Sequence, residues 1–168
     1  MESKSDLRLK AKDIRKTLDI KNISEKLCER IRNLDIYNFS KNVMIFYPMK
    51  YETDLRTLLN DDKKFYLPKV QCENLCICPY SADLIKSEFN VYEPCTKPAN
   101  PEVLDLIFVP ALMVDKNNYR LGYGGGFYDR FLANYPNVKT IVPIAKELLV
   151  EKLPHDEFDV KVDEIIFY

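Results

Sequence analysis

Short apolar runs alternate with helical segments along most of this chain, and this alternation limits the folds that the chain can adopt. The runs typical of strands are residues 43–47, 65–67, 106–109, 139–144 and 165–168. Helical patterns lie between several of them, notably at residues 54–60 and 127–134. Strands separated by helices favour an open α/β sheet over a helical bundle or a β-sandwich. We therefore predict a single domain over residues 1–168, built as three layers with a mainly parallel sheet flanked by helices.

Two helices are expected before the first strand. The first runs from Ser3 to about Leu18 and carries an apolar stripe with helical spacing, formed by Leu7, Ala11, Ile14 and Leu18. Asn22, followed three residues later by Glu25, is typical of a capped helix start. This second helix would bury Leu27, Cys28, Ile31 and Leu34.

The charge balance excludes a global attraction for nucleic acid. The chain has 25 Lys and Arg against 26 Asp and Glu, so any anion must be bound at a local site. No apolar run approaches the roughly 20 residues of a membrane span, and the N-terminus has no apolar signal segment. We therefore expect no nucleic-acid partner, no membrane partner and a cytoplasmic location.

Five cysteines form an odd set in a chain without an export signal, which indicates reduced thiols. Cys72, Cys76 and Cys78 lie close together in the sequence. Their spacing is not that of common zinc sites and no histidine is near them. We interpret them as small hydrophobic residues on or beside a strand.

All four glycines of the chain lie in residues 122–126, at Gly122, Gly124, Gly125 and Gly126. Ordered glycine loses about 0.5–1 kcal/mol of conformational entropy relative to alanine, so this concentration indicates a backbone geometry that side chains would block. The strand 106–109 precedes the cluster and the helix 127–134 follows it. A glycine-rich turn that opens a helix directs its N–H groups and the positive end of the helix dipole at one spot, as in phosphate sites.

A flexible surface turn is the alternative for this loop, but aromatic and basic residues flank it. It matches neither a Walker A loop, which ends in Gly-Lys-Ser/Thr, nor a dinucleotide fingerprint, which needs glycine where Phe127 stands. Asp129 follows just inside the helix. It either interacts with the helix dipole or binds phosphate through Mg²⁺. Arg120 is the better candidate for phosphate, and Arg130 for pairing with neighbouring acids.

Basic residues accompany the apolar stripe of the first helix. Lys4, Arg8 and Arg15 flank that stripe, where they could reach a cleft or form a solvated face. Glu52 and Asp159 lie next to strands, and each taken alone is typical of a surface or capping residue. His155 lies in a polar loop, where we expect an exposed residue without a role.

These residues resemble the 5-formyltetrahydrofolate cyclo-ligases along nearly the whole chain. The shared features, in family order, are Lys4 and Arg8, the segment from Tyr47 to Glu52, Leu67-Pro68, Tyr92-Glu93-Pro94 and residues 105–115. The most specific is Arg-Leu-Gly-Tyr-Gly-Gly-Gly-Phe-Tyr-Asp at residues 120–129.

The resemblance implies an enzyme that converts 5-formyltetrahydrofolate, with or without a polyglutamate tail, to 5,10-methenyltetrahydrofolate, consuming ATP with Mg²⁺ as a monomer. It assigns ATP binding to Lys4, Arg8, Arg120, Gly122, Tyr123, Gly124, Gly125, Gly126, Phe127 and Tyr128. It assigns folate contacts to Tyr47, Glu52 and Tyr123, and metal binding to Asp129 and Asp159. Arg120, Tyr128 and Asp129 are the predicted catalytic residues.

Several positions depart from the family pattern. Leu55 stands where a Thr is usual and Leu148 where a Gln is common, while Phe127 and Phe158 replace other ring side chains. The first two motivate an alternative, a non-catalytic nucleotide- or folate-binding protein on the same scaffold. An RNA-binding module that uses the basic stripe and the tyrosines is a third hypothesis, which the balanced charge opposes.

Overall fold

A six-stranded sheet forms the centre of the molecule, in the order β11-β9-β6-β1-β2-β3. The computed structural model describes residues 2–168. All neighbouring strands of this sheet are parallel except β2 and β3. The strands are β1 (Asn42–Met44), β2 (Lys64–Gln71), β3 (Asn74–Pro79), β6 (Leu106–Phe108), β9 (Lys139–Ile144) and β11 (Glu164–Phe167). The predicted α/β fold with a mainly parallel sheet is confirmed.

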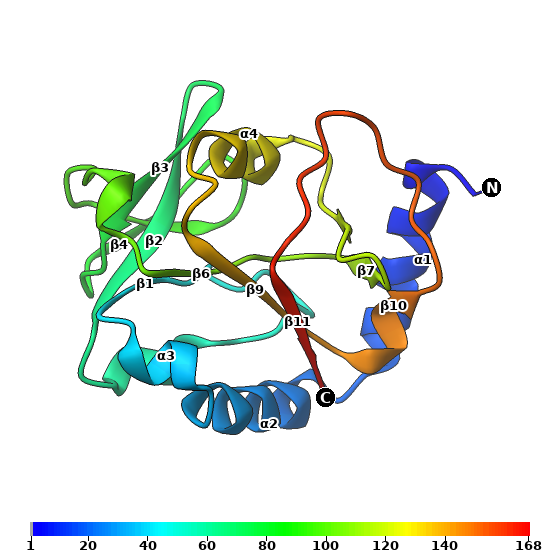
Figure 1. Ribbon diagram of the computed structural model, residues 1–168, viewed down its shortest axis with the longest axis horizontal. Coiled ribbons are helices and arrows are strands. Elements are labelled where there is room, and N and C mark those ends of the chain that lie inside the picture. Colours follow the sequence, from blue (N-terminus) through cyan, green and yellow to red (C-terminus); the bar gives the residue numbers. More distant parts are fainter. Residues whose placement is uncertain (1) are drawn as a thin grey trace.

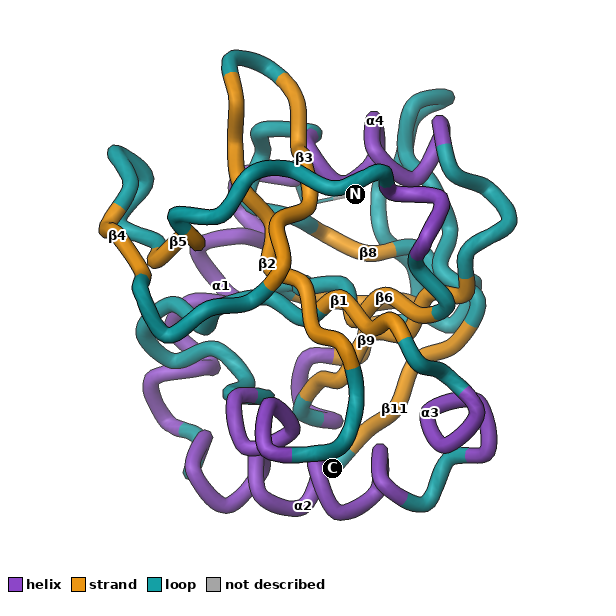
Figure 2. The backbone as a smooth tube through the Cα atoms, turned by 90° about the vertical axis from the view of Figure 1, so that its left-hand side faces the viewer, coloured by secondary structure: helices purple, strands orange, loops and turns teal. Residues whose placement is uncertain are grey.

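Helices cover both faces of the sheet. Figures 1 and 2 show α2 (Ile20–Arg32) and α3 (Asp35–Phe39) along one face and α4 (Phe127–Asn134) on the other. The first helix, α1 (Lys4–Thr17), contacts β7 (Met113–Asp115). Ser3 caps α1 by accepting a hydrogen bond from the Asp6 amide, and the Asp6 carboxylate accepts one from the Ser3 amide. Across residues 2–168, no helix combines the length and apolar character needed to cross a bilayer.

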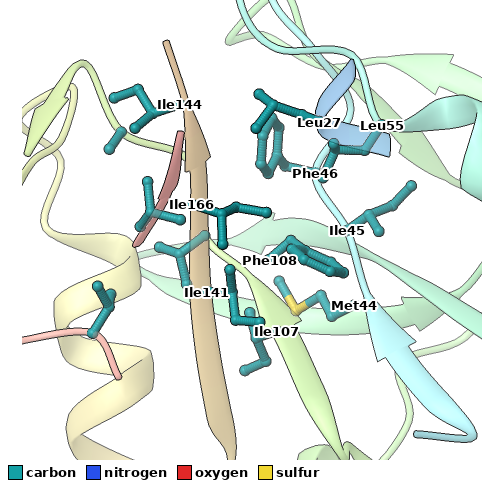
Figure 3. Packing of buried hydrophobic residues seen from close by; sticks show 14 of the residues in the cluster. Leu27, Met44, Ile45, Phe46, Leu55, Ile107, Phe108, Ile141, Ile144 and Ile166 are labelled. Carbon is teal, nitrogen blue, oxygen red and sulfur yellow. The ribbon is translucent and has the colours of Figure 1, made fainter. Parts of the chain in front are cut away.

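The main core lies between the sheet and its helices (Figure 3). Every residue of β6 is buried, as expected of a parallel strand covered on both faces. The helix stripes enter this core with Leu7 and Ala11 from α1 and with Leu27 and Ile31 from α2. The apolar periodicity of both helices was therefore predicted correctly.

Two small sheets complete the fold. One contains β10 (Leu149–Val150), β7 and β8 (Arg120–Leu121), and the other is the hairpin of β4 (Leu84–Lys86) and β5 (Tyr92–Pro94). Short 3-10 turns lie at Arg56–Asn60, Pro101–Val103 and Lys146–Leu148.

The structure corrects several boundaries. The α2 helix begins at Ile20 rather than Asn22, because the Asp19 side chain accepts a bond from the Asn22 amide and caps the helix. The segment expected as a helix at 54–60 contains only the 3-10 turn Arg56–Asn60. The strand that precedes the glycine loop is β8 and not residues 106–109, because the antiparallel β7–β8 pair lies between them.

The β7–β8 connection depends on the buried carboxylate of Asp115. Its Oδ1 accepts hydrogen bonds from the amides of Asn117 and Tyr119, at 2.9 and 3.0 Å, and its Oδ2 accepts from Leu153 at 2.9 Å. Asp115 is completely buried. It thus closes the turn that leads into β8 and attaches this turn to the segment after β10.

We predict that Asp115→Asn lowers the free energy of unfolding by about 1–3 kcal/mol, because the amide NH₂ would face backbone donors and leave one of them unsatisfied. Urea unfolding at neutral pH measures the change. Asp13→Asn, at an exposed position of α1, is the matched control. Equal unfolding free energies for both variants would contradict the prediction.

Candidate active site

A large pocket of about 1000 Å³ lies beside the glycine loop. Residues that follow the C-terminal ends of β1 and β6, among them Phe46, Tyr47, Glu52 and Pro110, line one part. The carboxyl ends of parallel strands are the usual ligand side of an open α/β sheet. The start of α1, the loop from β8 into α4 and residues 156–160 line the rest.

The glycine loop connects β8 to α4 with backbone angles that favour glycine. Gly124 has φ of 109° and Gly126, the N-cap of α4, has φ of 65°, in the left-handed region that other residues rarely adopt. A Cβ on Gly122 would lie 2.9 Å from Arg120 Nη1. The Arg8 Nε donates a 2.9 Å bond to the Gly122 carbonyl, so α1 holds the loop from outside.

Arg120 lies beneath this loop with a side chain that is only 3% exposed. Its Nη2 forms an ion pair with Asp129 Oδ1 at 3.0 Å, and its guanidinium lies 5.6 Å from the centre of the Tyr128 ring. Among the described residues, four buried side-chain atoms lack a partner in hydrogen-bond geometry, and three of them lie here: Arg120 Nε, Arg120 Nη2 and Tyr128 Oη, the fourth being Arg15 Nε. Such atoms are costly to bury unless a ligand satisfies them. Their position indicates an acceptor-rich ligand such as phosphate.

Two aspartates face the same part of the pocket, and each is paired with a cation. Asp129 Oδ1 accepts a bond from the Val160 amide at 3.1 Å, next to Asp159. The Lys4 Nζ contacts Asp159 Oδ2 at 2.5 Å and Asp156 Oδ2 at 2.9 Å. Partial burial opposes the charge of Lys4, but these bonds outweigh it and raise its pKa.

The chemistry of the two aspartates is compatible with Mg²⁺ when a phosphate supplies further ligands. Across residues 2–168, no group of three or more His, Cys, Asp or Glu is placed to hold a metal. Mg²⁺ commonly uses one or two carboxylates and takes its other ligands from water and substrate phosphates. Asp129 and Asp159, beside donors that lack acceptors, match this arrangement.

Glu52 is a buried acid of the pocket, only 5% exposed. Its Oε1 accepts a 2.8 Å bond from Tyr123 Oη, and its Oε2 accepts a 2.9 Å bond from the Met49 amide. Burial raises the pKa of Glu52, and the Met49 amide, Arg15 and Tyr123 oppose this shift. Burial and the Glu52 charge raise the pKa of Tyr123. Judged in isolation, Glu52 was expected to be a surface or capping residue. Its burial shows that a surface position is wrong.

Aromatic rings line the other part of the pocket. Tyr47 packs against Tyr92 with ring centres 5.0 Å apart, and Arg56 Nη1 donates a 3.0 Å bond to Tyr47 Oη. Phe89, from the connection between β4 and β5, meets Phe127 edge to face at 5.9 Å. These rings provide apolar surfaces on which a flat heterocycle could pack.

The fold brings all residues that the sequence predicted for the site to this one pocket. They are Lys4, Arg8, Tyr47, Glu52, Arg120, Gly122, Tyr123, Gly124, Gly125, Gly126, Phe127, Tyr128, Asp129 and Asp159. The sequence prediction missed Phe89 and Glu93, which also line it, and the buried contact of Arg15 with Tyr123. Glu93 belongs to one of the shared family features, so a signal existed for that residue.

The structure also places four residues that the sequence analysis discussed but did not assign to the site: Arg130, Leu55, Leu148 and His155. Arg130 does not pair with an acid: its Nη2 donates to the Glu73 carbonyl and its guanidinium lies over Phe127. Leu55 and Leu148 are buried in the core and do not line the pocket. His155 is exposed, as expected, and stacks on Tyr119.

Comparisons with known proteins agree on one family. The family model described as "5-formyltetrahydrofolate cyclo-ligase family" matches residues 1–168. The mouse 5-formyltetrahydrofolate cyclo-ligase is 30% identical over 152 residues, 78% of this chain and 75% of that protein. The Haemophilus influenzae protein of the same name is 29% identical over 84% of this chain and 83% of its own length. The NMR structure of Aquifex aeolicus 5,10-methenyltetrahydrofolate synthetase is 32% identical, with a TM-score of 0.86, covering 98% of this chain and 89% of that one.

We predict that Glu52→Gln changes how stability depends on pH. The folded protein holds the Glu52 proton more tightly than the unfolded chain, whose pKa is near 4.5. Stability therefore falls as pH rises from that value to the raised pKa of the folded state, by about 1.4 kcal/mol per pH unit across this interval. The variant cannot ionise, so its stability relative to wild type should increase across this interval and then level off.

Thermal unfolding of both proteins from about pH 4 to about pH 8 measures the difference in stability between variant and wild type. This range starts near the ordinary pKa of a carboxyl group and extends above it. Glu25→Gln, at an exposed position of α2, is the control. A Glu52→Gln difference that stays constant or falls with pH would contradict the prediction.

Proposed function

This chain belongs to the 5-formyltetrahydrofolate cyclo-ligase family, and we propose that its pocket converts 5-formyltetrahydrofolate to 5,10-methenyltetrahydrofolate with consumption of ATP. The observation that carries the ATP assignment is the buried Arg120 beside the glycine loop, which pairs with Asp129 but has no acceptor in hydrogen-bond geometry for Nε or Nη2 among the described residues. A triphosphate supplies such acceptors. The aromatic part of the same pocket has space for the folate ring system.

The chemistry explains why a phosphate donor is needed. Ring closure joins the formyl carbon to the second folate nitrogen, and the formyl oxygen is a poor leaving group. In the proposed reaction this oxygen attacks the γ-phosphorus and ADP leaves. The second nitrogen then adds to the formyl carbon and loses its proton, and cleavage of the C–O bond releases inorganic phosphate. The protein has to align oxygen with phosphorus and to stabilise the charge that develops.

The residues divide between the two substrates. Lys4, Arg8, Arg120 and the backbone amides of residues 122–128 would hold the triphosphate. Tyr47, Glu52 and Tyr123 would contact the folate. Tyr128 would donate its unpartnered hydroxyl to a phosphate oxygen. Charged donors such as Lys4, Arg8 and Arg120 stabilise a phosphoryl group during its transfer.

The ion pairs of the free protein suggest an exchange of partners when substrate binds. Mg²⁺ bound with the nucleotide would be held by Asp129 and Asp159 and would supply positive charge to the phosphate oxygens. Lys4 and Arg120, which pair with these aspartates in the structure, would then turn to phosphate. Asp129 and Asp159 would then have Mg²⁺ as their counter-charge, and Lys4 and Arg120 would have the phosphates.

We infer from the family resemblance that a monomer is the active unit. We place it in the cytoplasm, where the free thiols of its five cysteines would be maintained. The non-catalytic alternative loses its motive, since Leu55 and Leu148 are core residues.

The direct test of the activity mixes the protein with 5-formyltetrahydrofolate, ATP and Mg²⁺ and follows the methenyl absorbance band. We predict that Asp129→Asn slows its appearance by about 100-fold, the order typical for losing one group that stabilises developing charge. Asp62→Asn, at a position away from the pocket, is the control and should react like wild type. A wild-type rate for Asp129→Asn at saturating Mg²⁺ would remove Asp129 from the mechanism, and no band with any protein would refute the activity.

We also predict that Gly124→Ala weakens ATP binding by at least about 10-fold, because a side chain at φ of 109° forces the loop out of its conformation. Isothermal titration calorimetry with ATP and Mg²⁺ measures the affinity. Asn118→Ala, at another positive φ but in the β7–β8 turn, controls for strain alone. Equal ATP affinities in both variants would show that the loop does not bind the nucleotide.

A further inference from the structure

Arg15 is a buried cation that the proposed reaction does not use. It lies on α1, only 5% exposed, although arginine is almost never buried without a partner. Its Nη1 donates a 2.7 Å bond to Tyr123 Oη, and its Nη2 donates to the Ala111 carbonyl. Within residues 2–168 it forms no ion pair with a carboxylate. Its direct contact with the pocket is therefore through Tyr123.

The hydrogen bonds run in one direction from Arg15 to Glu52. Arginine can only donate, so the Tyr123 hydroxyl accepts from Arg15 and its own hydrogen points to Glu52 Oε1. The Met49 amide donates to the other oxygen of Glu52. Glu52 thus receives two hydrogen bonds and has the Arg15 charge behind Tyr123, and these interactions favour its ionised form against the burial that raises its pKa.

The chain of contacts also fixes the glycine loop. Tyr123 stands directly before the three consecutive glycines, which have wide backbone freedom. Arg8 holds the Gly122 carbonyl and Arg15 holds the neighbouring Tyr123 side chain. The two arginines are seven residues apart, so they lie on the same side of α1. One helix therefore holds the loop at two consecutive residues.

We propose that Arg15 is a positioning residue: through Tyr123 it holds both the Glu52 carboxylate and the first residues of the glycine loop in their working geometry. This inference rests on the proposed function, because Glu52 and Tyr123 are the residues assigned to the folate. Arg15 acts through Tyr123 and does not touch the substrate. It joins the folate part of the pocket to the triphosphate part.

Calorimetry with 5-formyltetrahydrofolate, without ATP, tests this role. We expect Arg15→Met to weaken binding about 10-fold at neutral pH, as expected for losing a charged hydrogen-bond donor that orients a binding group. Arg15→Lys, which keeps the charge, should recover part of the loss. Tyr123→Phe should also weaken binding. The double variant Arg15→Met/Tyr123→Phe should lose less affinity than the two single losses combined, because both changes break the same chain. Lys12→Met, exposed on the same helix, should bind like wild type.

The pH dependence separates positioning from a merely structural role. Glu52 faces Arg15 from α1, Tyr123 from the glycine loop and Tyr128 from α4. Loss of Arg15 removes the one cation of this set, so Glu52 should hold its proton to higher pH. In protein labelled with ¹³C-glutamate and free of substrate, the Glu52 titration midpoint should therefore move upward in Arg15→Met and stay unchanged in Lys12→Met.

Two results would overturn the proposal. A folded Arg15→Met protein with wild-type folate affinity and an unchanged Glu52 titration would reduce Arg15 to a packing residue. If Arg15→Met does not fold, Arg15→Lys and Tyr123→Phe decide: wild-type affinity and an unchanged Glu52 titration in both would also refute it. If wild-type protein does not bind 5-formyltetrahydrofolate, the proposed function fails, whereas the Glu52 titration still decides whether Arg15 controls the carboxylate.

Discussion

The burial of the Arg120 guanidinium is the interaction on which the rest of the pocket depends. A cation that is 3% exposed needs compensation, and the structure supplies only part of it: Asp129 balances its charge through Nη2, but neither Nε nor Nη2 has an acceptor in hydrogen-bond geometry among the described residues. Gly122 leaves the space that the guanidinium occupies. The glycine loop, the start of α4 and the Asp129 carboxylate are therefore arranged around one buried charge. A bound anion would accept hydrogen bonds from the N–H groups of Arg120 that lack acceptors.

The fold places two recognition chemistries side by side. Basic groups and loop amides gather at the N-terminus of α4, where the helix dipole also favours an anion. Aromatic rings and the buried Glu52 line the part that follows β1. Tyr123 belongs to both parts, because it extends the glycine loop and its hydroxyl reaches Glu52. The proposed transfer of a phosphoryl group to a formyl oxygen needs both substrates within reach of each other, and one shared pocket would provide this.

The sequence predicted those features that depend on local patterns. The apolar stripe of α1, the helix after the glycines and the buried strands β6 and β9 follow from periodicity and strand-like composition. The β7–β8 pair was missed because its turn depends on Asp115, whose third hydrogen bond comes from Leu153, 38 residues away. The burial of Glu52 was missed for the same reason. Met49 is a local partner three residues away, but Tyr123, and Arg15 behind it, come from distant segments that only the tertiary fold brings to Glu52.

The most direct test of nucleotide binding at this loop uses the fact that all four glycines of the chain lie in it. Labelling with ¹⁵N-glycine yields four backbone amide signals, and each reports on the proposed phosphate cradle. On titration with ATP and Mg²⁺, we expect these signals to shift together and to saturate with the affinity measured by calorimetry. ATP binding that leaves all four signals in place would show that the nucleotide binds elsewhere and would contradict the central claim.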